Sequence, residues 1–261
     1  MRKRKRTTSY ELSLEIDDDA FIRPPRDGQR NWLLNRFLRE AGADLQALDD
    51  IARRFAPGES RSLPADMRTA ELRDDEIMED WQLPLMDAMA NVATRPDADV
   101  LEIGFGRGIL ASLIQEAGAR SHTIVECNPH VLARFEQWRA TLTGRDIRIV
   151  PGLWQDVIGS LGTFDAVCFH TYALDEDEAV ELLSSSITFA AGFFPVAAAH
   201  LRDGGTFTYL TNEIDSLGRE HQRLLLEHFS EVRMRRVALQ VPPDVRDAWW
   251  ADSMIAIAAV K

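Results

Sequence analysis

Three glycines and one acidic residue carry the strongest chemical signal in this sequence. Gly104, Gly106 and Gly108 directly follow the apolar run VLEI, and glycines at the carboxyl end of a strand let the backbone approach a ligand closely. Glu126 ends the next apolar run about twenty residues later, where an acidic side chain can accept the hydroxyl hydrogens of a ribose. The spacing departs from the dinucleotide fingerprint, whose third glycine would fall at Ile109. Together the glycines and the carboxylate predict a site for a nucleoside.

A second polar group, His170, Thr171 and Tyr172, follows the apolar run DAVCF. A histidine has an unperturbed pKa of about 6.5, so at a strand end it can act as a base near neutral pH. It can equally orient a ligand, or hydrogen-bond only to the backbone or the substrate. These alternatives stay open on the sequence alone.

The chain from residue 97 onward predicts the frame that would hold these residues. Short apolar runs alternate with amphipathic segments, which is typical of a parallel sheet covered by helices on both faces. The expected strands lie within 98–105, 121–128, 146–152, 165–172, 204–211, 232–242 and 254–260, and the expected helices within 110–118, 130–142, 153–161, 187–201 and 220–229. The last two strands suit an antiparallel hairpin. Residues 97–261 are therefore predicted to form a doubly wound, mostly parallel α/β domain.

The residues before 97 are predicted to cover this domain. Residues 1–28 form an irregular tail, basic in MRKRKR and then acidic, and apolar residues spaced by three and four predict a helical hairpin over 29–55. A further helix is expected over 74–93, where Met78, Trp81 and Met86 share one side. We expect 29–96 to be a helical cover, or lid, that shields the strand ends from water.

Composition limits the class of protein. The formal net charge of −12 argues against binding of nucleic acid, and a solvated tail is the simpler interpretation of MRKRKR. The apolar stretch 187–200 is too short to span a membrane and contains Pro195. No signal-peptide core follows the basic start, which favours the cytoplasm. Cys127 and Cys168 suit reduced, buried thiols, and no metal site is expected.

Several motifs taken together resemble a known family. VLEIGFGRGI, VECN, PGLWQD, FDAVCFHTY and VPPD occur in the order and approximate spacing of class I S-adenosylmethionine-dependent methyltransferases, and specifically of guanidinoacetate N-methyltransferase and its protein-arginine relatives. MEDWQLPLM belongs to the same set, so the resemblance covers roughly residues 75–261. It implies a Rossmann-like fold and S-adenosylmethionine as the cofactor.

The resemblance also implies which residues hold the cofactor. Glu126 would hold the ribose, while Leu153 and Trp154 would flank the adenine ring, which favours flat apolar walls. A sulfonium attracts aromatic faces by about 0.5 to 2 kcal/mol, and Trp81 and Tyr172 are candidates for that role unless they are ordinary core aromatics. The full set expected at the cofactor is Met78, Met86, Gly104, Phe105, Gly106, Arg107, Gly108, Ile109, Glu126, Cys127, Asn128, Leu153, Trp154 and His170.

Two positions depart from the family that the motifs resemble. Its members carry carboxylates that hold the guanidinium of the acceptor, where this chain has Gln82 and His170. Leaving a desolvated guanidinium without its carboxylate costs about 3 to 5 kcal/mol, so guanidinoacetate is not expected as the acceptor unless another acid replaces them. Glu213 is the preferred replacement, with Asp175 and Glu176 as alternatives, although a solvated loop glutamate is the simpler interpretation.

Three functions remain compatible with these residues. The first is N-methylation of a small molecule, as in secondary metabolism, with His170 as base or orienter and Gln82 as a neutral hydrogen-bond partner. The second needs no acceptor, because the α-amino group of S-adenosylmethionine closes onto its own γ-carbon and gives azetidine-2-carboxylate and methylthioadenosine. The third is an S-adenosylmethionine-binding protein without catalysis. A homodimer formed through the helical cover is compatible with each.

Overall fold

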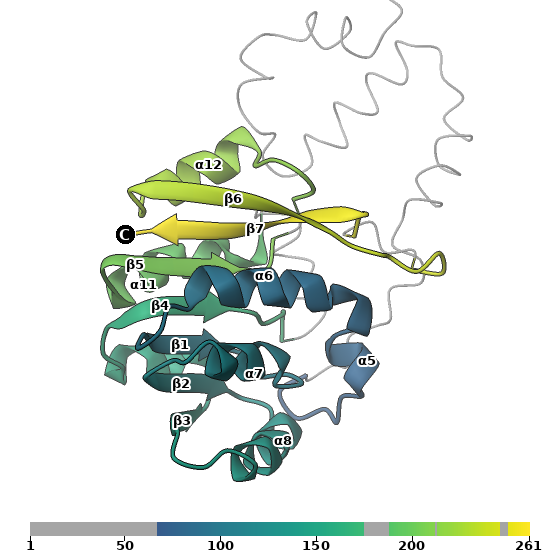
Figure 1. Cartoon of the computed structure of the whole chain (residues 1–261), viewed down its shortest axis with the longest axis vertical. Coiled ribbons are helices and arrows are strands. Elements are labelled where there is room, and N and C mark those ends of the chain that lie inside the picture. The colour runs from purple at the N-terminus through teal and green to yellow at the C-terminus, as the bar shows by residue number, and fades with distance from the viewer. Residues whose placement is uncertain (1–66, 175–187, 212, 246–249) are drawn as a thin grey trace, which may run out of the picture. The chain divides into compact units, whose positions relative to one another are not determined.

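The computed structural model describes residues 67–174, 188–211, 213–245 and 250–261, which contain a seven-stranded mixed sheet (Figure 1). The strands are β1 (Asp99–Ile103), β2 (Ser121–Glu126), β3 (Asp146–Pro151), β4 (Phe164–Phe169), β5 (Leu201–Tyr209), β6 (Glu231–Ala238) and β7 (Ser253–Val260). Their order across the sheet is β3-β2-β1-β4-β5-β7-β6. β1 to β5 pair in parallel, whereas β7 is antiparallel to both β5 and β6. The predicted Rossmann-like sheet with an antiparallel C-terminal hairpin is confirmed.

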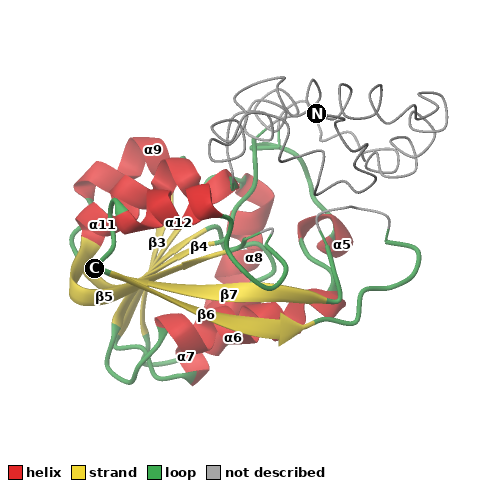
Figure 2. Cartoon of the chain, turned by 90° about the horizontal axis from the view of Figure 1, so that it is seen from above, coloured by secondary structure: helices red, strands yellow, loops and turns green. Residues whose placement is uncertain are grey.

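Helices cover the sheet on both faces, as expected for a parallel sheet whose strands are near-continuous apolar runs. The α-helices are α5 (Asp74–Ile77), α6 (Leu83–Ala93), α7 (Ile109–Glu116), α8 (Pro129–Ala140), α9 (Trp154–Val157), α11 (Phe194–His200) and α12 (Arg219–Leu226), and the 3-10 helices are η1 (Asp80–Gln82), η2 (Ile158–Ser160) and η3 (Phe189–Phe193). Figure 2 shows α9, α11 and α12 over one face of the sheet and α6 and α7 under the other. Each face therefore has its own apolar core.

The stretch expected as one helix over 74–93 is divided into α5, η1 and α6. Met78 has an extended backbone, with φ −165° and ψ 137°, and ends α5. The guanidinium of Arg107 donates to the carbonyl oxygen of Met78 at 2.7 Å, so this carbonyl is bound by a distant residue at the point of the break. Pro84 then lies in the first turn of α6, where proline is well tolerated. A tertiary contact thus interrupts a helical pattern.

Within the predicted cover, the described part packs directly on the sheet. In α6, Leu85, Met86 and Met89 are buried against residues of β1, β4 and β7. The predicted tail 1–28, the hairpin 29–55, and Asp175 and Glu176 lie outside the described residues.

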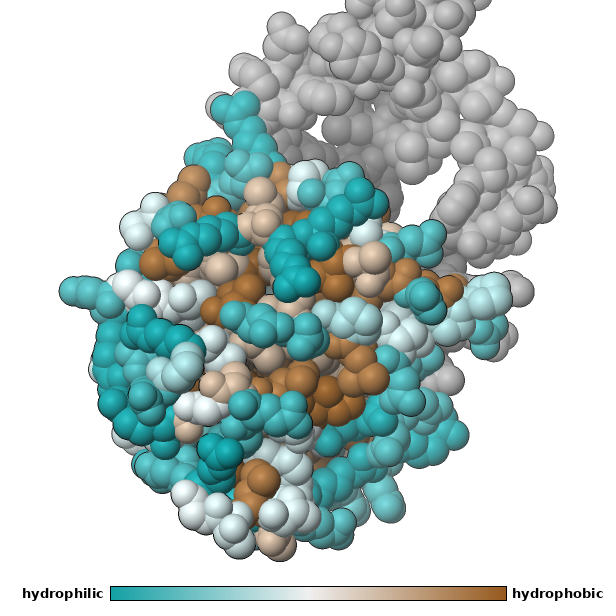
Figure 3. Space-filling model, in the orientation of Figure 1, coloured by the Kyte–Doolittle hydropathy of each residue, from teal (hydrophilic) through white to brown (hydrophobic). Residues whose placement is uncertain are grey.

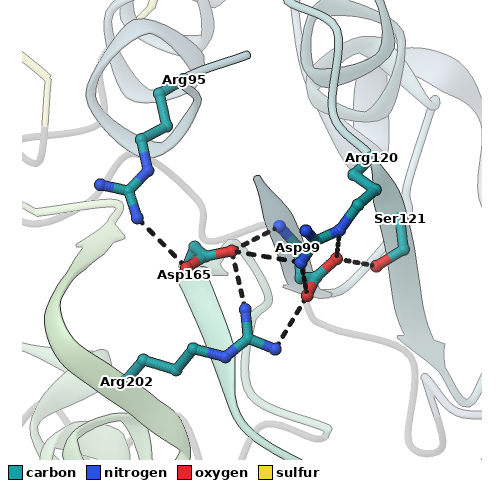
Figure 4. A network of polar contacts seen from close by, with 6 residues as sticks. All are labelled: Arg95, Asp99, Arg120, Ser121, Asp165 and Arg202. Carbon is teal, nitrogen blue, oxygen red and sulfur yellow. Dashed lines mark hydrogen bonds and ion pairs between the residues drawn. The ribbon is translucent and has the colours of Figure 1, made fainter. Parts of the chain in front are cut away.

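The edge of the sheet at which the parallel strands begin, which we call the amino edge, carries a network of charged side chains (Figure 4). Arg202 contacts Asp99 and Asp165, each at 2.8 Å, while Arg120 binds Asp99 and Arg95 binds Asp165. The hydrogen bond from Arg120 holds the pKa of Asp99 well below its usual range. Burial acts to raise the pKa of Asp165, but hydrogen bonds from the Asp99 N–H and from Arg202 outweigh it and lower that pKa.

Polar and apolar residues are interspersed on the face of the molecule seen in Figure 3. The large apolar side chains exposed among the described residues are Leu83, Tyr172, Ile214, Leu226 and Met234, which come from different elements. None of the helices in the described ranges is both long and apolar enough to span a bilayer.

Candidate active site

The glycine turn joins two strand ends at the opposite edge of the sheet, which we call the carboxyl edge. Gly104 donates to the carbonyl oxygen of Val125 at 2.9 Å, and His170 donates to that of Ile103 at 3.0 Å. Gly104 has a φ of +89°, and a Cβ there would lie 2.3 Å from the carbonyl oxygen of His170. Only glycine therefore permits this close approach between the ends of β1 and β4.

Glu126 is fixed at the end of β2 by three backbone N–H groups. Its Oε1 accepts from Cys127 at 2.8 Å and from Asn128 at 2.9 Å, and its Oε2 accepts from Phe105 at 3.0 Å. The last bond links the carboxylate to the glycine turn. Because a carboxylate has about four lone-pair sites, Glu126 keeps capacity to accept a ligand hydroxyl.

Asn128 lines the same region, but its side chain is already engaged. Its Oδ1 caps α8 by accepting from His130 at 2.8 Å and from Val131 at 3.3 Å. Its Nδ2 donates to the carbonyl oxygens of Met67 and Ala70, each at 2.8 Å. Asn128 therefore positions two segments around the site rather than offering a free amide.

Two cavities open at the carboxyl edge and meet at Glu126. From the predicted cofactor set, the first cavity is lined by Met78, Met86, Gly104, Phe105, Gly106, Arg107, Ile109, Glu126, Cys127, Asn128 and His170. Leu153 and Trp154 line the second cavity, and Gly104, Glu126, Cys127, Thr171, Tyr172 and Leu174 line both. Gly108 lines neither and instead caps α7 with a φ of +74°. The carboxylate thus lines both a partly aromatic cavity and one bordered by most of the glycine turn.

Sequence reasoning missed a segment that also lines the first cavity. Met67, Leu72, Glu76 and Ile77 contribute to its wall. Met67 and Leu72 lie outside the quoted motifs and the predicted helices, so no signal in the sequence identified them. Glu76 and Ile77 lie in the helix expected over 74–93 but were not assigned to the site. Beyond β4, Thr171 and Tyr172 from the predicted polar group line this cavity, together with Ala173 and Leu174, which were not singled out.

His170 lines the first cavity and holds a buried ring nitrogen. Its Nε2 has no hydrogen-bond partner within the described part of the chain. Burial lowers the pKa of His170 to about 4, so the imidazole is neutral at pH 7. The unperturbed value of about 6.5 expected from the sequence does not apply here. The ring is a weaker base than expected and an available hydrogen-bonding group.

Trp81 and Gln82 line neither cavity. Trp81 packs edge-on against Trp250, with ring centroids 4.8 Å apart, and its Nε1 donates to Glu79 at 2.9 Å. Gln82 is 6% exposed, and its Oε1 has no partner among the described residues. Gln82 therefore holds a second unused, buried hydrogen-bonding atom in the segment before α6.

Glu213 follows β5 at the carboxyl edge and is part of a polar chain. Its Oε1 accepts from Gly218 N at 3.2 Å and from His221 Nδ1 at 3.1 Å. The Nε2 of His221 lies 2.5 Å from the hydroxyl of Tyr209, and both of these side chains are fully buried. Glu213 itself lines neither cavity, so its role toward an acceptor stays a prediction.

These residues fit the three parts of S-adenosylmethionine. The second cavity, with Leu153 and Trp154, suits an adenine; the carboxylate of Glu126 suits a ribose; and the glycine turn suits a compact amino-acid chain. The unpartnered Nε2 of His170 is an additional polar atom that a bound group could satisfy.

Comparisons with known proteins agree with this arrangement. The sequence profile described as guanidinoacetate N-methyltransferase matches residues 59–243. Protein arginine N-methyltransferase 2 of Eremothecium gossypii is 35% identical over 131 residues, which are 46% of this chain and 31% of that protein. The protein of the same name from Saccharomyces cerevisiae is 30% identical over 121 residues, which are 41% and 28% of the two chains. The alignments thus span about a third of the length of these curated relatives.

Two solved structures are similar at low identity. Precorrin-6y C5,15-methyltransferase from Geobacter metallireducens has a TM-score of 0.47 and 13% identity, covering 76% of this chain and 97% of that chain. TrmN from Thermus thermophilus has a TM-score of 0.47 and 16% identity, covering 80% and 53%. Since the family profile matches well over half of the sequence, this chain belongs to the guanidinoacetate N-methyltransferase family of S-adenosylmethionine-dependent methyltransferases, with S-adenosylmethionine as its cofactor.

Proposed function

We propose that this protein transfers a methyl group from S-adenosylmethionine to a nitrogen of a small molecule. The cofactor supplies a methyl on a sulfonium, which is already a good leaving group. The protein contributes proximity and orientation, which can account for most of the acceleration in such a displacement. The observation that carries the proposal is the pair of cavities that meet at Glu126, in a chain whose family uses this cofactor.

The acceptor nitrogen would enter beside His170, which lines the first cavity just after β4 and whose buried Nε2 has no partner among the described residues. A neutral imidazole can accept a hydrogen bond from an amine. As a weak base, it can take a proton from the amine only when that proton is weakly held. His170 would therefore orient an acceptor that is already uncharged at the reacting nitrogen. Gln82, with its unused Oε1, would be a second neutral partner.

A positively charged end of the acceptor would need a carboxylate, and Glu213 is the one we propose. His221 and Gly218 both bind its Oε1, which leaves Oε2 for a ligand. The arginine-methylating relatives make an arginine-like acceptor worth testing, although the residues aligned with the guanidinium-binding carboxylates are Gln82 and His170 in this chain.

A second candidate is cyclisation of S-adenosylmethionine, and the neutral, buried His170 favours it. A neutral imidazole can hold the α-amino group of this substrate in its deprotonated form by hydrogen bonding. The amino nitrogen would then bond to the γ-carbon, and the carbon–sulfur bond would break with its electron pair on sulfur. Azetidine-2-carboxylate and methylthioadenosine would result, and the proton lost from nitrogen would pass to solvent.

Product analysis separates these functions. The purified chain is incubated with S-adenosylmethionine alone, with a panel of amines, and with arginine and guanidinoacetate, and the products are identified by mass spectrometry. Acceptor-dependent S-adenosylhomocysteine supports methyl transfer, whereas methylthioadenosine formed without an acceptor supports the cyclase. If neither product forms under any condition, both catalytic proposals are wrong.

A further inference from the structure

Residues 67–78 form a strap along the first cavity. Met67, Leu72, Glu76, Ile77 and Met78 all contribute to the cavity wall. A ligand in this cavity would therefore lie between the glycine turn and the strap, and the position of the strap would decide how firmly the ligand is enclosed.

Apolar burial does not anchor the strap at its start. No residue from 67 to 77 is buried, and α5 within it has no buried side chain; Met78 is the first buried residue. The strap is instead held by hydrogen bonds to its backbone. Asn128 donates to the carbonyl oxygens of Met67 and Ala70, and the N–H of Met67 donates to the carbonyl oxygen of Leu174 at 2.9 Å.

Arg134 on α8 holds the middle of the strap. Its Nη2 donates to the carbonyl oxygen of Leu72 at 2.7 Å, and its Nη1 forms an ion pair with Asp74. These two bonds use the forked geometry of the guanidinium, which a lysine ammonium cannot reproduce. Leu72 lines the cavity, so one bond from Arg134 acts directly on the backbone of a wall residue.

We propose that Arg134 is a positioning residue for the S-adenosylmethionine site: by holding Leu72 and Asp74 it keeps the strap against the cavity and slows release of the bound cofactor. Arg134 lines neither cavity and acts through the strap. The inference rests on cofactor binding at the proposed site and not on which reaction follows.

The test measures how fast S-adenosylhomocysteine leaves the full-length protein, by stopped-flow displacement. Arg134→Met removes both contacts while keeping an unbranched apolar stem. Loss of charge-assisted hydrogen bonds of this kind should speed release about tenfold, equivalent to about 1.4 kcal/mol. Asp74→Asn should speed release less, because it leaves the bond to Leu72 in place.

Arg139→Met is the matched control. Arg139 lies on the same helix and also donates to two carbonyl oxygens, those of Leu142 and Arg145, but these belong to the loop between α8 and β3 and not to the strap. Its substitution should leave the release rate unchanged. Both variants should have similar melting temperatures, so a general loss of stability of α8 would not explain a difference in release.

The proposal is overturned if Arg134→Met releases the ligand at the rate of the unsubstituted protein, or if Arg139→Met speeds release equally. Should Arg134→Met fail to fold, Arg134→Lys decides the question: faster release than in the unsubstituted protein supports the proposal, and an equal rate overturns it. If the unsubstituted protein binds no S-adenosylhomocysteine, the proposed function fails first, which is a distinguishable result.

Discussion

The two edges of one sheet differ in how their polar groups are used. At the amino edge, Asp99 and Asp165 are each bound by two arginines and by further hydrogen bonds (Figure 4). At the carboxyl edge, His170, which lines the first cavity, holds a buried ring nitrogen that no described residue binds. Buried polar groups are normally paired, so an unpaired atom beside a cavity is a mark of function rather than of stability. The comparison suggests that charge stabilises the fold at one edge and that ligand binding is confined to the other.

The largest expected effect comes from filling the space at Gly104. Gly104→Ala should weaken S-adenosylmethionine binding about a hundredfold or more, equivalent to about 2.7 kcal/mol. The reason is that a Cβ would lie 2.3 Å from the carbonyl oxygen of His170 and push β1 and β4 apart. Isothermal titration calorimetry measures the change.

Gly118→Ala is the matched control for this substitution. Gly118 has a similar φ of +82°, but a Cβ there would meet nothing within 4 Å. Both variants carry the same backbone strain, so Gly118→Ala should lower stability modestly and leave cofactor affinity intact. If Gly104→Ala and Gly118→Ala lost cofactor affinity equally, backbone strain, and not the close approach at the carboxyl edge, would explain the weaker binding.

At the amino edge, Asp99→Asn should change stability without changing function. Removing the charge that pairs Arg120 and Arg202 should lower the free energy of unfolding by about 1 to 3 kcal/mol, measured by urea denaturation. The dissociation constant of S-adenosylmethionine should stay the same. Glu231→Gln serves as the control, because Glu231 pairs with Arg233 at an exposed position of β6 and should have no measurable effect. A large loss of cofactor affinity in Asp99→Asn would remove the distinction between the edges.

The two edges should also respond to pH in different windows. The pKa of His170 is lowered to about 4 in the folded protein, whereas in the unfolded chain this side chain takes up a proton near pH 6.5. The free energy of unfolding therefore falls as the pH drops from about 6.5 toward 4. The lowered pKa values of Asp99 and Asp165 stabilise the fold above about pH 4, and that contribution is lost below it. His170→Gln should remove a pH-dependent contribution of about 3 kcal/mol from the first window only.

This pH prediction is checked by the free energy of unfolding measured from pH 3 to 8. His221 also has a pKa lowered by burial and acts in the same direction, but it is present in both proteins and cancels in the difference. A difference between His170→Gln and the unsubstituted protein that does not vary with pH would contradict the burial of a neutral imidazole at this edge.

The smallest effect is expected for Tyr209→Phe. Loss of the hydroxyl leaves His221 Nε2 without its partner and loosens the orientation of Glu213, so the KM of a cationic acceptor should rise about threefold. Cofactor affinity should not change. Steady-state kinetics with the acceptor found in the product screen provide the measurement. If Glu213→Gln raises KM strongly while Tyr209→Phe does nothing, the polar chain does not position the carboxylate.

The parallel strands were predictable because most are compact apolar runs between helical segments, as 100–103 shows, and the apolar run 254–260 identified β7. Glu126 was expected at the end of the second strand, near the glycine turn, and it lies there. The break at Met78 was not predictable, because it coincides with a hydrogen bond from the distant Arg107. The pKa of His170 depends on its burial in the folded protein, which local sequence does not encode. The strap carries no motif, so its place at the cavity was not predictable either. Trp81 was a candidate either for the sulfonium or for an ordinary core aromatic, and it packs on Trp250, a pairing that only the tertiary fold brings about.

Binding of S-adenosylmethionine to a Glu126→Ala variant tests the central claim most directly. The carboxylate at this position is held by three N–H groups and is expected to accept the ribose hydroxyls, so its loss should weaken binding about a hundredfold or more by calorimetry. Circular dichroism would verify that the variant is folded. An unchanged dissociation constant in a folded Glu126→Ala protein would contradict the assignment of this edge as the cofactor site.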